Sequence, residues 1–270
     1  MTTPKPLYIP TSSINAKDQP PSRRIFMGIV GAAGSGKTTA ALTFPNPVVA
    51  DFDNGLEEHK GKREIISQPF YNDEWCLAQG ARKLTGDYEG IPIETVNRRD
   101  LIHKYIKKEY SKLTPEQTLI IDSWTKLQDA FDATTHCQPA YTEKGKVDGY
   151  AFWGRKLEYS TQLMNNLMAL SCNVVVVFHE VRDVDSDGAV TGKIQALQQG
   201  SFRNKIPVSF NDFLRCVNVS EKKAKEIGFH DERFFFQTKQ TATFDAKSRS
   251  IKHDGDYVPA NYESFVKFSG

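Results

Sequence analysis

Blocks of apolar residues alternate with helix-patterned, more polar stretches along this chain, and this order predicts an α/β protein. Four apolar runs are short and continuous, as buried parallel strands are, and each ends at or beside a polar or acidic residue or a glycine. They are Ile25–Val30, Val48–Asp53, Thr118–Asp122 and Asn173–Phe178. We expect them to form a mostly parallel central sheet flanked by helices.

Helical spacing of apolar residues predicts the segments that cover this sheet. The predicted helices span 37–44, 73–84, 98–113 and 151–170. The third is basic on its outer side, which is most simply a solvated face, and a nucleic-acid patch is the less favoured interpretation. A turn region is expected near Gly86–Gly90, between the second and third helices.

The pattern after residue 178 predicts smaller elements. A hairpin around Asp187-Gly188, followed by a flexible loop, accounts for Arg182–Ser201. Strands follow at Phe210–Val219 and Arg233–Gln237, and the charged run EKKAKE between them is a solvated turn or short helix. We divide the chain into a flexible arm over 1–24, one core over 25–250 and a C-terminal extension over 251–270.

A glycine-rich loop between the first strand and the first helix carries the strongest chemical signal. Residues 31–38, GAAGSGKT, match the P-loop pattern G-x-x-x-x-G-K-[ST] in its required strand-to-helix context, which disfavours a tight turn with an accidental lysine. Its glycines allow successive backbone N–H groups to point at phosphate oxygens. We expect ATP and Mg²⁺ as cofactors, with Lys37 on the β- and γ-phosphates and Thr38 on the metal. The predicted nucleotide-binding residues are Gly31, Ala32, Ala33, Gly34, Ser35, Gly36, Lys37, Thr38 and Thr39.

Acidic residues at the ends of two other strands point to the same sheet edge. Thr118–Asp122 resembles a Walker B strand, and Asp122 is predicted to hold a Mg²⁺-bound water, although a helix-capping role is an alternative that can coexist with it. Many P-loop ATPases carry a glutamate directly after this aspartate, whereas Ser123 stands here. The general base must therefore lie elsewhere. Asp53 is the first candidate, ahead of Asp51 and Glu57.

His179 follows the fourth strand at the same edge. A role in sensing the γ-phosphate and a simple strand-end cap are equally compatible with a lone histidine.

Three segments resemble the RecA-like branch of P-loop NTPases. ADFDNGL at 50–56, LIIDSWTKL at 119–127 and VVVVFHE at 174–180 are similar to its acid-bearing strand, its Walker B strand and its polar sensor. More narrowly, the chain resembles phage-encoded RecA-like nucleotide-binding proteins, a group that includes single-strand annealing recombinases working with a single-strand-binding protein. That resemblance covers about residues 25–250. Its most specific segments are 31–55, IIDSW at 120–124, FWGRKLE at 152–158 and FDAKSRS at 244–250.

The resemblance implies a Mg²⁺-dependent ATPase that oligomerises with nucleotide at the subunit interface and binds single-stranded DNA. It also implies that Lys247 and Arg249 reach into a neighbour's nucleotide, and a basic surface turn is an equally weighted interpretation. The implied catalytic set is Lys37, Asp53, Asp122, His179, Lys247 and Arg249. The chain departs from RecA in its histidine sensor, its shorter aspartate base and its lack of a large additional DNA-binding domain. These departures weaken a prediction of strand exchange more than one of ATP binding.

Two predicted loops are the candidate DNA contacts. The first, over 136–150, offers Lys144, Lys146 and Tyr150. The second, over 182–204, offers Lys193, Gln195, Gln198, Gln199, Phe202 and Arg203. Basic or amide groups interleaved with aromatic rings are typical of single-strand binding, but plain mobile loops explain both segments equally well.

Composition narrows the remaining choices. The formal net charge of +2 means that nucleic-acid binding must come from local basic surface. The four cysteines form no C-x-x-C pair, which argues against a disulfide framework or a zinc site. The N-terminus lacks the apolar core of a signal peptide, so we expect a cytoplasmic protein, in the host cell if the chain is phage-encoded.

Two other function classes stay open. One is a nucleotide-gated assembly switch or helicase loader, in which ATP orders loops and turnover is slow. The other is a small-molecule kinase, which the absence of an evident arginine-rich lid in the sequence disfavours.

Overall fold

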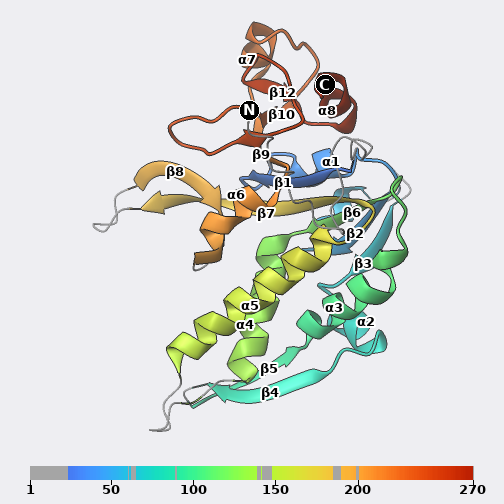
Figure 1. Cartoon of the computed structure of the whole chain (residues 1–270), viewed down its shortest axis with the longest axis vertical. Helices are drawn as coiled ribbons and strands as arrows, with labels where there is room; N and C mark the ends of the chain where they lie inside the picture. The colour runs from blue at the N-terminus through green and yellow to red at the C-terminus, as the bar shows by residue number, and fades with distance from the viewer. Residues whose placement is uncertain are drawn as a thin grey trace, which may run out of the picture.

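The computed structural model describes residues 24–59, 61, 65–88, 90–138, 141, 148–184, 190–198 and 201–269. Its main sheet has the strand order β12-β10-β9-β1-β7-β6-β2-β3 (Figure 1). The parallel strands are β1 (Phe26–Gly31), β2 (Pro47–Asp51), β3 (Ile66–Pro69), β6 (Thr118–Asp122), β7 (Asn173–Val184) and β9 (Asp212–Asn218). The prediction of an α/β fold with a mostly parallel central sheet is confirmed, and the architecture is that of a P-loop NTPase.

Antiparallel strands add to this sheet. They are β8 (Val190–Ala196) on β7, β11 (Lys247–Ser248) on β9, β10 (Phe234–Gln237) on β9 and β12 (Tyr257–Pro259) on β10. The sheet therefore continues past residue 250. Helix α8 (Tyr262–Phe268) follows β12 and packs against Phe44, whose ring centroid lies 5.4 Å from that of Tyr262.

The two faces of the sheet are covered by separate apolar clusters, because alternate residues of each strand point to opposite faces. Val174 and Val176 of β7 join the cluster under α3 (Arg98–Lys108), α4 (Trp124–Cys137) and α5 (Gly149–Met168). Val175 and Val177 join the cluster that includes residues of α1 (Lys37–Ala41) and α8. Burial on both faces explains why the central strands are apolar throughout. Among the described residues, no helix combines the length and apolar character that crossing a membrane requires.

Residues 73–96 differ from their prediction. Helix α2 (Asp73–Ala78) is shorter than expected, because Gly80 adopts a positive φ of 84° after it. The residues beyond it form a second, two-stranded sheet, β4 (Lys83–Tyr88) paired with β5 (Ile91–Val96), where a turn region was predicted. This hairpin lies against the end of α4, and a Cβ on Gly86 would come within 2.5 Å of the carbonyl oxygen of Cys137.

Other helices and strands also begin or end at residues different from those predicted. Helix α1 stops at Ala41 rather than residue 44, and α3 stops at Lys108 and continues as a 3-10 turn, Tyr110–Lys112. Strand β7 runs five residues past His179 to Val184, and α7 (Glu221–Glu226) is the short helix of the charged run. Of the predicted arm, residues 1–23 lie outside the described residues. Arg24 is fixed, since its guanidinium donates to the carbonyls of Leu167, Met168 and Cys172.

Candidate nucleotide-binding site

The P-loop connects β1 to α1 in a conformation that requires its glycines. Gly34 and Gly36 have φ values of 72° and 87°, in the left-handed region that side chains disfavour. A Cβ on Gly36 would also overlap the ring of Phe234. A Cβ on Gly31 would lie 2.5 Å from Ser35 Oγ. The loop is thus shaped both by backbone conformation and by close packing, as a phosphate-binding turn needs to be.

Lys37 lies within this loop rather than extending into solvent. Its ammonium donates to the carbonyl oxygen of Ala32 over 2.6 Å, and the residue is only 7% exposed. Burial lowers the pKa of Lys37, and the carboxylates of Asp122, Glu180 and Asp53 counteract that effect. A cation held among backbone groups at the end of β1 is placed to attract a phosphate.

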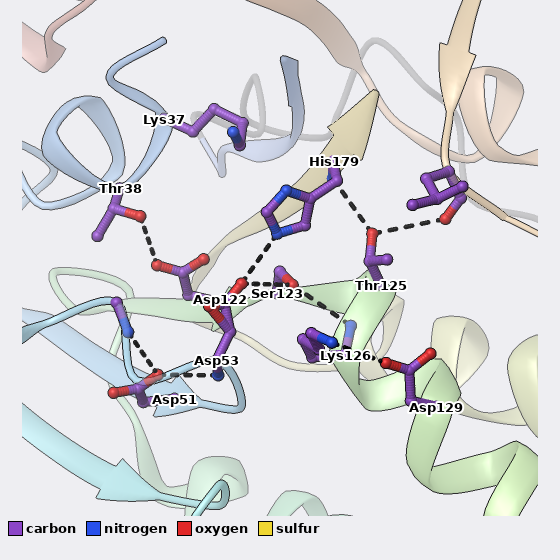
Figure 2. A network of polar contacts seen from close by, with 12 residues as sticks. Lys37, Thr38, Asp51, Asp53, Asp122, Ser123, Thr125, Lys126, Asp129 and His179 are labelled. Atoms are coloured by element: carbon purple, nitrogen blue, oxygen red, sulfur yellow. Dashed lines mark hydrogen bonds and ion pairs between the residues drawn. The ribbon is translucent and has the colours of Figure 1, made fainter. Parts of the chain in front are cut away.

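Thr38, on the helix that follows β1, meets Asp122 at the end of β6, although β7 lies between β1 and β6 in the sheet. The Thr38 hydroxyl donates to Asp122 Oδ2 over 2.7 Å (Figure 2). Asp122 is 2% exposed, and burial raises its pKa to about 6. A Cβ on Gly55 would lie 3.4 Å from the same oxygen and 3.7 Å from Thr38 Oγ1, so the Gly55 backbone lies directly beside the pair.

This pair fits Mg²⁺, which takes few protein ligands and keeps several waters. The described residues contain no group of three or more His, Cys, Asp or Glu suited to a metal held by protein alone. Thr38 and Asp122 are therefore the residues that would hold the metal of a metal-nucleotide complex.

Asp53 and His179, predicted separately as base and sensor, are hydrogen-bonded to each other. Asp53 Oδ2 accepts from Ser123 Oγ over 3.1 Å and lies 2.9 Å from His179 Nε2 (Figure 2). The hydrogen bond with His179 lowers the pKa of Asp53, against the opposing effect of burial. Both side chains are partly exposed, so water can reach them. An ionised carboxylate fixed by two donors can orient a water molecule.

Asp51, one of the alternative bases, accepts hydrogen bonds from the backbone. Its Oδ1 accepts from the N–H groups of Asp53 and Gly55, over 3.2 and 3.3 Å. Asn54 between them has a positive φ of 57°. Asp51 thus shapes the turn that presents Asp53. Glu57, the other alternative, lies exposed in a 3-10 turn, Glu57–His59.

An ion pair between Glu180 and Arg215 borders the site and was missed by sequence reasoning. Arg215 Nε lies 2.8 Å from Glu180 Oε2, and a second bond of 3.0 Å joins its terminal nitrogen to Oε1. Arg215 lies opposite Val30 of β1, one residue before the P-loop, and Glu180 directly follows His179. A charged residue inside the apolar strand FLRCV was the available signal.

Lys247 and Arg249 lie at the opposite edge of the sheet from the P-loop. Residues 247 and 248 pair with Phe213 and Asp212, at the start of β9, whereas the P-loop follows the end of the neighbouring parallel strand β1. Lys247 donates to three carbonyls of its own chain, the nearest being Phe210 at 2.6 Å. Arg249 is exposed. Within one subunit, therefore, neither residue joins the site.

The turn that carries Arg249 is fixed by one buried carboxylate. Asp212 accepts from the backbone N–H groups of Arg249 and Ser250 and from the hydroxyls of Ser248 and Ser250. The FDAKSRS segment is thus an ordered turn with one exposed cation.

Two residues of the second predicted DNA loop, Gln198 and Phe202, are buried, so the prediction that they contact DNA is wrong. Phe202 is 4% exposed and stacks on Trp124, and Gln198 accepts from the indole N–H of Trp124 over 2.9 Å. Buried in the core, they cannot stack on or contact bases. Arg203 donates to the carbonyl of Gln198 and to the Gln195 side chain, and Lys193 is exposed on β8. Gln199 lies outside the described residues.

The first predicted loop is shorter than expected. Helix α4 extends to Cys137 and α5 begins at Gly149. Lys144 and Lys146 lie outside the described residues, and Tyr150 is 94% exposed.

Comparison with protein families gives one match that covers most of the chain. A family model described as an AAA domain matches residues 23–250, which include every predicted site residue. A search of the curated proteins found no match. The family is one of P-loop ATPases that generally bind ATP with Mg²⁺, in agreement with the P-loop and the Thr38–Asp122 pair. The chain therefore belongs to the AAA domain family of P-loop ATPases.

Proposed function

We propose that this protein is a Mg²⁺-dependent ATPase that oligomerises and binds single-stranded DNA in phage-type homologous recombination or strand annealing. The observation that carries the hydrolytic part is the placement of Asp53. Its ionised carboxylate, held by His179 and Ser123, lies at the same sheet edge as Lys37 and the Thr38–Asp122 pair. These are the groups that phosphoryl transfer to water requires.

Each residue then has one task. Lys37 and the backbone of the P-loop bind the phosphates, and Thr38 and Asp122 hold the metal with its waters. The metal, when bound, neutralises charge on the phosphates. Asp53 orients a water whose oxygen bonds to the γ-phosphorus as the bond to the bridging oxygen breaks. The proton of that water passes to Asp53, and ADP and phosphate leave.

His179 would report the state of the nucleotide to the rest of the chain. Its N–H donates to Thr125 Oγ1 over 3.2 Å, and its carbonyl accepts from the N–H of Leu197 over 2.7 Å. Leu197 directly follows β8, so the residue beside Asp53 is bonded to the hairpin that carries Lys193. This contact supports coupling between ATP and a DNA-binding hairpin.

The position of Arg249 supports an oligomer. An exposed cation at the sheet edge opposite its own P-loop can stabilise transition-state charge only at a neighbour's nucleotide. In that arrangement the nucleotide lies between subunits. A single-strand-binding protein is the expected partner of such an assembly.

ATP hydrolysis by the purified protein with Mg²⁺, with and without single-stranded DNA, tests this function. Lys37→Ala protein provides the blank. Hydrolysis that DNA stimulates supports the proposal. ATP-dependent assembly without DNA-stimulated turnover would instead identify an assembly switch or helicase loader, and a phosphorylated metabolite in place of free phosphate would identify a kinase.

A further inference from the structure

A basic groove of about 700 Å³ lies between α3 and α5, lined by residues that the nucleotide site does not use. Helix α3 contributes Arg99, Lys107 and Lys108, and α5 contributes Gln162, Asn165 and Asn166. The lining extends along α3 from Arg99 to Lys108. At about 1.5 Å per residue this is about 14 Å, over which a stacked strand presents about four phosphates at roughly 3.4 Å each.

The charges of this groove are available to a ligand. Within the described part of the chain, no ion pair or side-chain hydrogen bond involves Lys107 or Lys108, and both are exposed. The carboxylate that lines the groove, Asp100, is engaged by Arg99 and by the side-chain amide of Asn97. The groove therefore presents a positive surface.

The groove is preformed, because contacts at two levels hold α3 against α5. The Arg99 guanidinium lies 4.3 Å from the ring centroid of Tyr159. One turn further along, Asn166 Nδ2 lies 3.3 Å from His103 Nδ1. Burial lowers the pKa of His103, which favours the neutral imidazole that can accept this bond at neutral pH. A ligand entering a fixed groove loses less free energy to ordering.

We propose that the groove between α3 and α5 binds the phosphodiester backbone of a nucleic-acid strand, as a contact separate from the nucleotide site. Lysine ammonium groups and exposed amides are donors suited to phosphate oxygens. The ring in the lining, Tyr159, is covered by Arg99 and offers no apolar pocket of the kind that anchors a peptide. The binding is independent of ATP and of base sequence, so it does not rest on hydrolysis.

Neutralising two exposed lysines tests the groove without disturbing the core. Lys107→Gln with Lys108→Gln in the full chain is compared with Lys222→Gln with Lys223→Gln on α7, which makes the same change in formal charge at another exposed helix. The probe is a fluorescent 30-nucleotide oligothymidine, titrated without ATP at several salt concentrations.

We expect the groove variant to bind about tenfold more weakly or worse, and its salt slope to fall by about 1.4, since each lost single-strand phosphate contact accounts for about 0.7. The α7 variant should bind like the parent. Equal affinity and slope in the groove variant would overturn the proposal, and would leave the hydrolytic function and the β7–β8 hairpin contact untouched. Nearly equal binding of oligothymidine and oligodeoxycytidine supports backbone recognition, and a strong preference for one base contradicts it.

Crosslinking locates the strand directly. The four native cysteines are buried, so Asn165→Cys provides an exposed thiol for a photoreactive maleimide, and Lys222→Cys serves as its control. We expect Asn165→Cys, but not Lys222→Cys, to crosslink to the oligothymidine. Loss of the crosslink on addition of polyglutamate at equal charge would identify a general polyanion surface and overturn the assignment to nucleic acid.

Discussion

The hydroxyl of Thr38 and the buried carboxylate of Asp122 are joined by a 2.7 Å hydrogen bond between the P-loop and a strand that is not its neighbour. The strand between them, β7, ends its parallel pairing at His179, so the hydrogen-bonded pair of Asp53 and His179 lies at the same edge. The metal position, the base and the sensor therefore belong to one connected site.

Thr38→Val should abolish Mg²⁺-dependent nucleotide binding, because it removes the hydroxyl while keeping the shape of the side chain. Titration of a fluorescent ATP analogue with and without Mg²⁺ measures the effect. Thr38→Ser is the matched control and should keep the Mg²⁺ dependence. Undiminished Mg²⁺ dependence in the valine variant would remove Thr38 from the metal site.

Asp53→Asn should bind ATP like the parent and hydrolyse it about 10²–10⁴-fold more slowly, since general-base catalysis typically contributes that factor. Single-turnover phosphate release measures the chemical step. Glu58→Gln, an exposed neutralisation nearby, should hydrolyse at the parental rate. If Asp53→Asn is as fast as the parent, Glu57 becomes the candidate base.

Asp122 should make the nucleotide-free protein less stable as pH rises. Its folded-state pKa of about 6 lies above the ordinary value, so the folded protein binds a proton more tightly than the unfolded chain does. The resulting contribution to the free energy of unfolding is fully present below the unfolded-state pKa and is lost as pH rises through about 6. The change amounts to about 3 kcal/mol, at about 1.4 kcal/mol for each pH unit.

Melting temperatures measured from about pH 4 to about pH 8 follow this loss of stability. The range covers most of the interval between the ordinary and the raised pKa of Asp122 and extends above it. Asp122→Asn, which keeps an oxygen for Thr38, should melt higher than the parent at the alkaline end without Mg²⁺. An identical pH dependence in the two proteins would show that Asp122 does not cause it.

Arg249→Ala should lose turnover only in the assembled protein, because its guanidinium is at the edge opposite its own P-loop. Mixing Arg249→Ala with Lys37→Ala subunits should give more activity than either alone, since each supplies what the other lacks. No recovery on mixing, with assembly intact, would argue against action across subunits.

Lys247→Ala should behave differently from Arg249→Ala. Loss of its contacts with carbonyls in and directly after α6 (Ile206–Ser209) should cost about 1 kcal/mol, which lowers the melting temperature by roughly 2–4 °C. Scanning calorimetry measures this. A normal melting temperature together with lost activity would restore Lys247 to the predicted intersubunit role.

Lys193→Ala should weaken single-strand binding in the presence of ATP if the β7–β8 hairpin contacts DNA. Lys193 is chosen because it lies on β8 and is exposed. Anisotropy titrations with Lys205→Ala, another exposed lysine, serve as the comparison. Unchanged affinity and salt slope would exclude the hairpin as the contact.

The strand-end residues could be predicted from the sequence because one topological rule brings them together. The carboxyl ends of parallel strands lie at one edge of the sheet. A lysine after β1, an acid after β2, an acid at the end of β6 and a histidine in β7 therefore converge there, whatever their separation in the chain. The P-loop motif around Lys37 identifies this edge of the sheet as the nucleotide-binding edge.

The remaining features depend on tertiary contacts that local patterns do not encode. The β4–β5 hairpin is specified by its packing on the end of α4, near Cys137, more than by its own alternation. Phe202 reads as an exposed loop aromatic, but the stacking partner that buries it, Trp124, lies in another helix far away in the chain. The pairing of Glu180 with Arg215 likewise needs the sheet order, which places β7 and β9 on either side of β1.

The close contact between Gly36 and Phe234 limits how far the chain can be truncated at its C-terminal end. Phe234 lies on β10, whose outer partner β12 comes from beyond the end of the family match. A chain shortened to residue 250 would lose β12 and α8, uncover Phe44 and Phe236, and leave the strand behind the phosphate loop as an open edge prone to aggregation. The cooperative folding unit is therefore longer than the region that the family shares.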